Sequence, residues 1–162
     1  MSENGFISSG PIFDAMVDFF QEDEWDFDQV GRAPELIMGY AGDNGEWHCF
    51  AQARDEEHQF IFYSILDDTI PPEKQPQAAE YLARATYGLV MGAFELNYDD
   101  GEVRFRTGID VDGGELNKDM IKNIVYFNLY TMDRYVAGLK QVVEEGLAPA
   151  DVVAQVEAEE EA

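Results

Sequence analysis

His48 and Cys49 are adjacent residues whose side chains could form a nucleophile and its base in this sequence of 162 residues. A histidine beside a cysteine activates the thiol for covalent catalysis. Both residues fall in a strand-like run at 46–54, however, and neighbouring side chains of a strand point to opposite faces of the sheet. The two side chains therefore cannot meet without a bulge, and we expect Cys49 to be a buried structural residue.

The stretch Asp110-x-Asp112-Gly-Gly-Glu115 carries the oxygen-bearing side chains that Ca²⁺ prefers. A calcium loop of the EF-hand type needs oxygen ligands at positions 1, 3 and 5, glycine at 6 and glutamate at 12. Counted from Asp110, the last three of these positions hold Gly114, Glu115 and Ile121, so the pattern fails at three places. We interpret the stretch as a turn between a strand and a helix.

The other candidates for catalysis or ligand binding are weak. The acid pairs Asp67-Asp68 and Asp99-Asp100 stand at strand ends, where we interpret them as solvated turn residues and not as acid–base pairs. Two histidines, of which His58 lies in a turn, and one cysteine are too few for a zinc site. The sequence contains no GxxxxGK[ST] or GxGxxG pattern for a nucleotide phosphate. We therefore predict no catalytic, cofactor-binding or metal-binding residues, no cofactor, and a protein that is not an enzyme.

The formal net charge of −24 comes from 34 Asp and Glu against 10 Lys and Arg. So acidic a surface repels phosphate backbones and anionic lipid, and Arg104 with Arg106 is the only close basic pair, so we expect no nucleic-acid and no membrane partner. No run approaches the roughly 20 apolar residues that span a bilayer. The first residues lack the basic and apolar regions of a signal peptide, and the lone cysteine gives no sign of an oxidising compartment. We expect a soluble, cytoplasmic protein.

The periodicity of the apolar residues predicts an α+β domain with the order α-βββ-α-ββ-α. Short turns between the strands imply antiparallel neighbours, so the sheet is expected to be antiparallel and packed with helices. We divide the chain into a single domain at 1–147 and an acidic C-terminal tail at 148–162, partly disordered, with a short helical piece after Pro149. The expected elements are a helix from Pro11 to about 22–24, strands at 35–41, 46–54 and 59–66, a helix at 76–90 that ends at Gly92, a hairpin at 94–98 and 103–110, and a helix from Asn117 to Gly146.

The hairpin is predicted from Asp100-Gly101, which favours a two-residue type I′ turn. Alternation on both sides of this turn places Glu95 or Asn97 opposite Arg104 or Arg106 on the wet face.

The strand expected at 59–66 is apolar on both of its faces, which places it in the centre of the sheet. One face carries Phe60, Phe62 and Leu66, and the other carries Ile61, Tyr63 and Ile65. The second face then needs a cover, either from the same chain or from another protomer. The last helix is about 28 residues long, which is long for so small a domain, so we expect one of its ends to project into a partner, and Gly138 to allow a bend.

The segment from Gly92 to Leu96, followed by Asp99 to Arg106 and by Asp112 to Leu116, resembles the bacterial YbjN family. The resemblance implies a fold similar to that of type III secretion chaperones, often dimeric, and a role in regulating sensory transduction without an established catalytic motif. The expected function is a non-enzymatic, chaperone-like or regulatory module that binds itself as a homodimer and a protein or peptide through residues that the sequence does not identify. A small-ligand sensor with a groove between sheet and helix, or an acidic-residue metal-dependent enzyme, are the alternatives.

Overall fold

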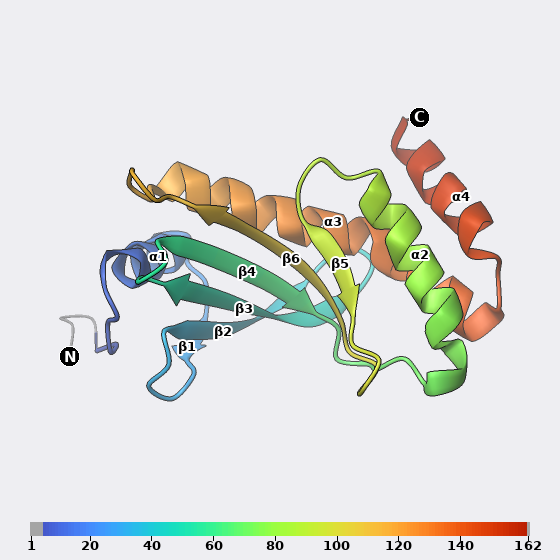
Figure 1. Cartoon of the computed structure of the whole chain (residues 1–162), viewed down its shortest axis with the longest axis horizontal. Helices are drawn as coiled ribbons and strands as arrows, with labels where there is room; N and C mark the ends of the chain where they lie inside the picture. The colour runs from blue at the N-terminus through green and yellow to red at the C-terminus, as the bar shows by residue number, and fades with distance from the viewer. Residues whose placement is uncertain (1–4, 162) are drawn as a thin grey trace.

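The structure is a computed structural model that describes residues 5–161 (Figure 1). It consists of one sheet with helices packed on one of its faces, and the predicted fold class, α+β with an antiparallel sheet packed with helices, is confirmed. The elements in chain order are α1 (Pro11–Glu22), β1 (Phe27–Gln29), β2 (Glu35–Ala41), β3 (Glu46–Arg54), β4 (Gln59–Ile65), a 3₁₀ turn (Pro72–Lys74), α2 (Gln75–Tyr87), β5 (Ala93–Leu96), β6 (Val103–Asp110), α3 (Lys118–Glu145) and α4 (Pro149–Glu161).

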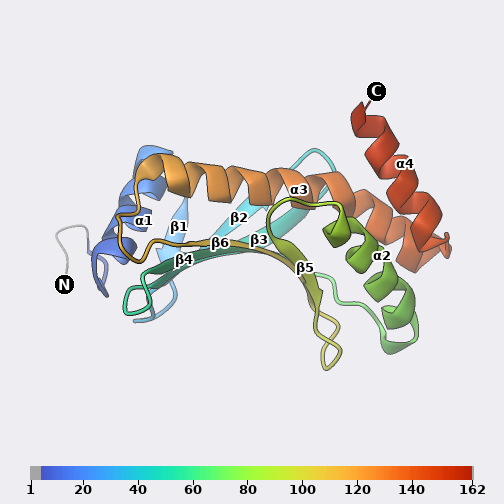
Figure 2. The same ribbon diagram turned by 45° about the horizontal axis from the view of Figure 1, so that its top comes forward.

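The six strands form one sheet in the order β1-β2-β3-β4-β6-β5, with antiparallel neighbours throughout. β4 lies between β3 and β6, which confirms its predicted central position. Helices α1 and α3 cover one face of the sheet, while α2 and α4 stack together beside β5 at one end (Figure 2). No helix of the described chain covers the opposite face, so the cover expected on that side of β4 is not a helix of this chain.

The core lies between the sheet and its helices and is rich in aromatic rings. Phe20 of α1 stacks on Phe62 of β4 with 6.2 Å between ring centroids, and Phe94 packs on Phe105 at 4.6 Å. Trp25 and Phe27 pack back on Phe20, as predicted, although Phe27 does so from β1, a strand that the sequence did not reveal.

A chain of polar groups crosses this core beneath β4. The Ser64 hydroxyl accepts a hydrogen bond from Trp47 Nε1 at 2.9 Å and donates to Asn128 Oδ1 at 2.6 Å. Asn128 Nδ2 donates to the carbonyls of Phe62 and Phe105, each at 3.0 Å, and to Thr107 Oγ1 at 3.1 Å. Asn128 belongs to α3 and its partners belong to β4 and β6. These hydrogen bonds therefore fix both the position of α3 along the strands and the face of the helix that packs on the sheet.

The start of α1 is held by a residue from a distant turn. The Asp55 carboxylate accepts hydrogen bonds from the backbone N–H of Ile12 at 2.7 Å and of Phe13 at 3.4 Å, and from Ser9 Oγ at 2.6 Å. It therefore caps a helix whose own preceding residue, Gly10, has no side chain to do so. Residues 1–4, part of the predicted loose segment 1–9, lie outside the described residues.

Both predicted ends of α3 are confirmed. Asn117 Oδ1 accepts a hydrogen bond from the Met120 N–H at 2.9 Å, and Gly146 ends the helix in the left-handed conformation at φ 72°. The predicted projection of this helix into a partner is wrong at its C-terminal end, because α2 and α4 pack against it there (Figure 1).

Gly138 of α3 permits a close crossing of helices. A Cβ atom at this position would lie 2.3 Å from Tyr81 Oη of α2 and 2.9 Å from Val152 Cγ1 of α4. Tyr81 Oη in turn donates to the Tyr135 carbonyl at 2.7 Å. α4 buries Val152 and Val153 at this crossing and continues to Glu161, where the sequence predicted a partly disordered tail. The division of the chain after residue 147 stays a prediction.

The predicted type I′ turn of the hairpin is wrong, because the loop is longer. The Gly101 N–H donates to the Asn97 carbonyl at 2.7 Å, and of the two turn residues only Gly101 has a positive φ, of 79°. The Asp100 carboxylate accepts from the Glu102 N–H, and Ile70 donates to the Gly101 carbonyl at 2.8 Å, so the loop is tied to the end of the β4–α2 connection. The preceding helix, α2, also ends earlier than predicted, at Tyr87, and Gly92 instead turns the chain into β5 at φ 80°.

Candidate functional site

The uncovered face of the sheet carries a row of side chains that runs across five strands. We call Asp28, Ile37, Phe50, Tyr63 and Arg106 the central row. Each of these residues is the direct cross-strand partner of the next. The row has an acid at one end, three apolar or aromatic side chains in the middle and a base at the other end. Its three middle side chains are half-buried, although no helix lies over them.

A second row beside it is dominated by ion pairs. Glu95 accepts from Arg104 Nε at 2.8 Å and from Arg106 Nε at 3.2 Å, which confirms the predicted cross-strand pairing of the hairpin. The Arg104 guanidinium also lies 4.6 Å from the centroid of the Tyr63 ring. This contact explains why Tyr63 is half-buried, since a guanidinium and its stem shield part of the ring.

His48 and Cys49 lie on opposite faces of β3, as the alternation predicts. His48 is on the uncovered face, where Nδ1 lies 2.7 Å from the Asp67 carboxylate, whereas Cys49 is fully buried. Burial raises the pKa of the Cys49 thiol to about 12, against which the hydrogen bonds of Ser64 and Trp47 act only in part. The thiol is therefore neutral and shielded, and the two residues cannot act as a catalytic pair.

The acidic stretch after β6 is a turn, as interpreted from the sequence. Asp110 Oδ1 accepts from the Asp112 N–H at 2.9 Å, and this bond lowers the pKa of the Asp110 carboxyl together with the Gln59 side chain. Within residues 5–161, no group of three or more His, Cys, Asp or Glu side chains is placed to hold a metal ion. The acid pairs at 67–68 and 99–100 are exposed at the ends of their strands.

One groove of about 380 Å³ lies between the C-terminal half of α3 and the chain that leaves β4. Its walls combine apolar side chains with several carboxylates and a single cation, Lys140. None of the described helices is both long and apolar enough to cross a membrane.

The fold, with helices on only one face of its sheet, defines a one-sided α+β domain. Sequence comparison assigns the chain to a known protein family. Residues 13–141 match the model of the YbjN family, described as "Putative bacterial sensory transduction regulator", and the chain belongs to this family. No curated protein sequence is significantly similar to the chain.

Two solved structures are similar in fold. One is the crystal structure of YbjN from E. coli, described as "a putative transcription regulator", with a TM-score of 0.58 and 10% identity over 77% of this chain and 88% of that one. The other belongs to the HopA1–SchA chaperone–effector complex, with a TM-score of 0.45 and 16% identity over 78% of this chain and 94% of that one. At this identity, the similarity to YbjN concerns the fold alone.

The sequence did not identify the central row as a surface. Tyr63 was recognised only as part of a strand that is apolar on both sides, and Arg106 only as part of the close basic pair. The signal that joins them is the register of the strands, because Ile37, Phe50 and Tyr63 come from three strands and meet only when those strands are aligned.

Proposed function

We propose that this chain is a non-enzymatic, regulatory or chaperone-like module that binds protein and acts as a homodimer through the uncovered face of its sheet. The observation that carries the proposal is the central row, with its apolar middle and its opposite charges at the two ends. The description of the family as a regulator supports the same class of function.

The central row is self-complementary under two-fold symmetry. With Phe50 on the axis, antiparallel stacking of two sheets places Ile37 over the partner's Tyr63 and Asp28 over the partner's Arg106. A closed dimer of this kind uses the same surface patch on both subunits. The three apolar side chains then lose their remaining water contact, and Asp28 meets the partner's Arg106, a guanidinium that also stays paired with Glu95 of its own chain.

The uncovered face is large enough for such a dimer. Five strand spacings of about 4.8 Å and seven residues of about 3.4 Å give about 570 Å² per protomer, or about 1,100 Å² in total. This area lies slightly above the roughly 1,000 Å² expected of a specific interface. The dimer is therefore expected to be reversible and sensitive to single substitutions in the central row.

The mass in solution tests the dimer. Light scattering of the wild-type chain should give about 37 kDa, twice the 18.3 kDa of one chain. Phe50→Glu should give the monomer mass, whereas the matched variant Tyr98→Glu, at an exposed tyrosine of the hairpin loop, should remain dimeric. A wild-type chain that stays monomeric at about 1 mM overturns the homodimer.

A charge exchange locates the contact. Asp28→Arg and Arg106→Asp should each weaken the dimer, because each brings like charges together across the two-fold axis. The double variant Asp28→Arg with Arg106→Asp restores opposite charges and should restore dimerisation. Equal weakening by the double variant would place the dimer contact elsewhere.

A small-ligand sensor is the second candidate, favoured by the groove of about 380 Å³ beside α3, a volume within the range of ligand pockets. Its carboxylates would select a cationic ligand. A ligand that binds only the folded chain raises the melting temperature, and Lys140→Glu should strengthen that rise for a cation.

A further inference from the structure

The strand β6 is longer than the strand that pairs with it on the outer side. β4 pairs with β6 from Arg104 to Asp110, whereas β5 pairs with it only from Val103 to Arg106. Among residues 5–161 no strand lies against the outer side of β6 beyond Arg106. Gly92, at φ 80°, turns the chain away from β6 and so stops β5 from continuing along it (Figure 1).

The free edge presents backbone donors and acceptors. The Leu66 N–H donates to the Val103 carbonyl, and the Val111 N–H donates to the His58 carbonyl, so odd-numbered residues of β6 direct their backbone groups toward β4. Alternation along an antiparallel ladder then directs the N–H and C=O of Gly108 and Asp110 toward the free edge. An edge of this kind is a template for another strand.

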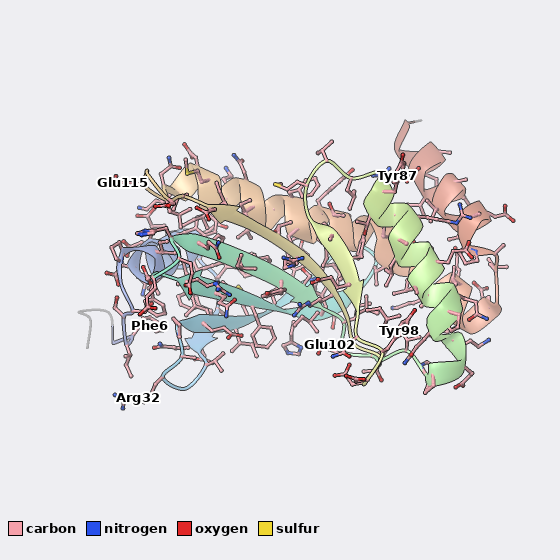
Figure 3. All side chains as sticks on the ribbon, viewed as in Figure 1. Phe6, Arg32, Tyr87, Tyr98, Glu102 and Glu115 are labelled. Carbon is pink, nitrogen blue, oxygen red and sulfur yellow. The ribbon has the colours of Figure 1, made fainter. Side chains whose placement is uncertain are left out.

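A shallow groove of about 460 Å³ follows this edge. It is lined by side chains of β6, by Ile61 on the uncovered face, and by Met91 of the loop between α2 and β5. Val90 of the same connection is 96% exposed, and Tyr87, the last residue of α2, is 95% exposed but lies on the side of α4 and outside this groove. Figure 3 labels Tyr87 at the end of α2. Apolar side chains this exposed are typical of contact surfaces.

The charge around the groove selects the partner. Asp110 lines the groove, Asp112 and Glu115 follow it in the chain, and Arg106 is already engaged by Glu95. The whole chain adds a net charge of −24, which attracts cations over long range. A second copy of the chain fits poorly, because antiparallel pairing of two such edges brings the Asp110 carboxylates of both copies to one short seam.

We propose that the free edge of β6 at 107–110 binds an extended, basic segment of a partner protein, which adds to the sheet as a further strand. Its apolar side chains lie beside Ile109 and Met91 on the covered side, and its Lys or Arg side chains lie beside Asp110 on the uncovered side. This inference names a partner class for the protein-binding function proposed above and rests on it, but its edge at 107–110 adjoins the central row only at Arg106.

Peptide binding tests the inference directly. The probe is a ten-residue peptide of alternating Val and Lys, compared with a peptide of alternating Val and Glu. In the wild-type chain the Val–Lys peptide should slow amide hydrogen exchange at Gly108 and Asp110 at least tenfold, because both N–H groups become hydrogen-bonded. The Val–Glu peptide should bind at least tenfold more weakly.

Two variants separate the edge from the charge. Asp110→Pro removes one outward N–H without touching the ladder to β4, and Asp110→Lys reverses the local charge; each should weaken the Val–Lys peptide at least tenfold. The matched variant Asp99→Lys makes the same charge change in the exposed hairpin loop and should alter affinity less than twofold. Nuclear magnetic resonance spectra of all three variants establish that each is folded.

Several outcomes overturn the inference. They are no binding of the Val–Lys peptide to the folded wild type at 1 mM, equal binding of the two peptides, and protection by the peptide that leaves Gly108 and Asp110 unchanged. Phe50→Glu distinguishes the two proposals, since a monomeric variant that still binds the peptide leaves the edge site standing while removing the dimer contact. A wild-type dimer that binds no peptide removes the edge site and leaves the dimer.

Discussion

Asn128→Ala measures how strongly the buried polar chain fixes α3 on the sheet. The substitution removes four hydrogen bonds, one with Ser64, one with Thr107 and one with each of two strand carbonyls. At about 1 kcal/mol of net contribution per bond, the loss is about 4 kcal/mol. The Ser64 hydroxyl then has no acceptor for its proton other than the weak one at Cys49 Sγ, 3.7 Å away.

The matched control is Asn123→Ala, on the exposed side of the same helix. It gains the same helix propensity, about 0.5 kcal/mol, without losing a buried bond. The entropy of unfolding for 162 residues is about 0.34 kcal/mol per kelvin. A loss of 4 kcal/mol in the free energy of unfolding therefore lowers the melting temperature by about 12 °C. Urea unfolding followed by circular dichroism gives both free energies.

A difference below about 1 kcal/mol between the two alanine variants would refute the reasoning. Asn128→Leu separates hydrogen bonds from packing, because leucine refills the space but restores none of the bonds. If Asn128→Leu recovers wild-type stability, the polar chain contributes nothing and α3 is held by packing alone.

Three further predictions follow from single side chains. Gly138→Ala should destabilise the chain by about 1–3 kcal/mol in urea unfolding, although alanine is the better helix former, because its Cβ would meet Tyr81 Oη at 2.3 Å; a stabilised variant contradicts this crossing. The Cys49 thiol, with its pKa raised to about 12, should react with a disulfide reagent about a thousandfold more slowly in the folded than in the urea-unfolded chain at pH 8. Desolvation and the hydrogen bond to Asp23 raise the pKa of Tyr126 to about 12. The folded chain therefore favours the protonated phenol, and the contribution of this group to the free energy of unfolding, present below pH 10, should fall as pH rises through 10–12. Tyr126→Phe should show a shallower fall, and identical pH profiles would exclude this tyrosine as the cause.

The strands of this fold can be predicted because their residues alternate, and their antiparallel order because the turns between them are short. The same alternation predicts that Cys49 is buried and His48 is not. β1 escapes this reasoning because three residues, Phe27–Gln29, are too few to show a period. The cap of α1 escapes it as well, because Asp55 lies more than 40 residues away and reaches the helix only in the folded chain.

The sequence alone does not show what shields the second face of β4 from water. Apolar residues at Ile61, Tyr63 and Ile65 indicate that water is excluded, but composition does not say by what. In the structure a neighbouring guanidinium, that of Arg104, shields Tyr63 in part. A covering helix, a shielding arginine and a second subunit leave the same pattern of apolar residues in one strand, so the register of several strands is needed to distinguish them.

The crossing at Gly138 offers a way to sort the relatives of this chain by a single position. The family model ends at residue 141, before α4 begins, so membership of the family does not by itself imply a fourth helix. A side chain at this position would meet Tyr81 of α2 and Val152 of α4, so a relative that keeps both helices in place cannot tolerate a bulky residue where Gly138 lies. Relatives with glycine there are therefore expected to keep the close packing of α2 and α4 on α3, and those with leucine or phenylalanine to have moved or lost at least one of these two helices.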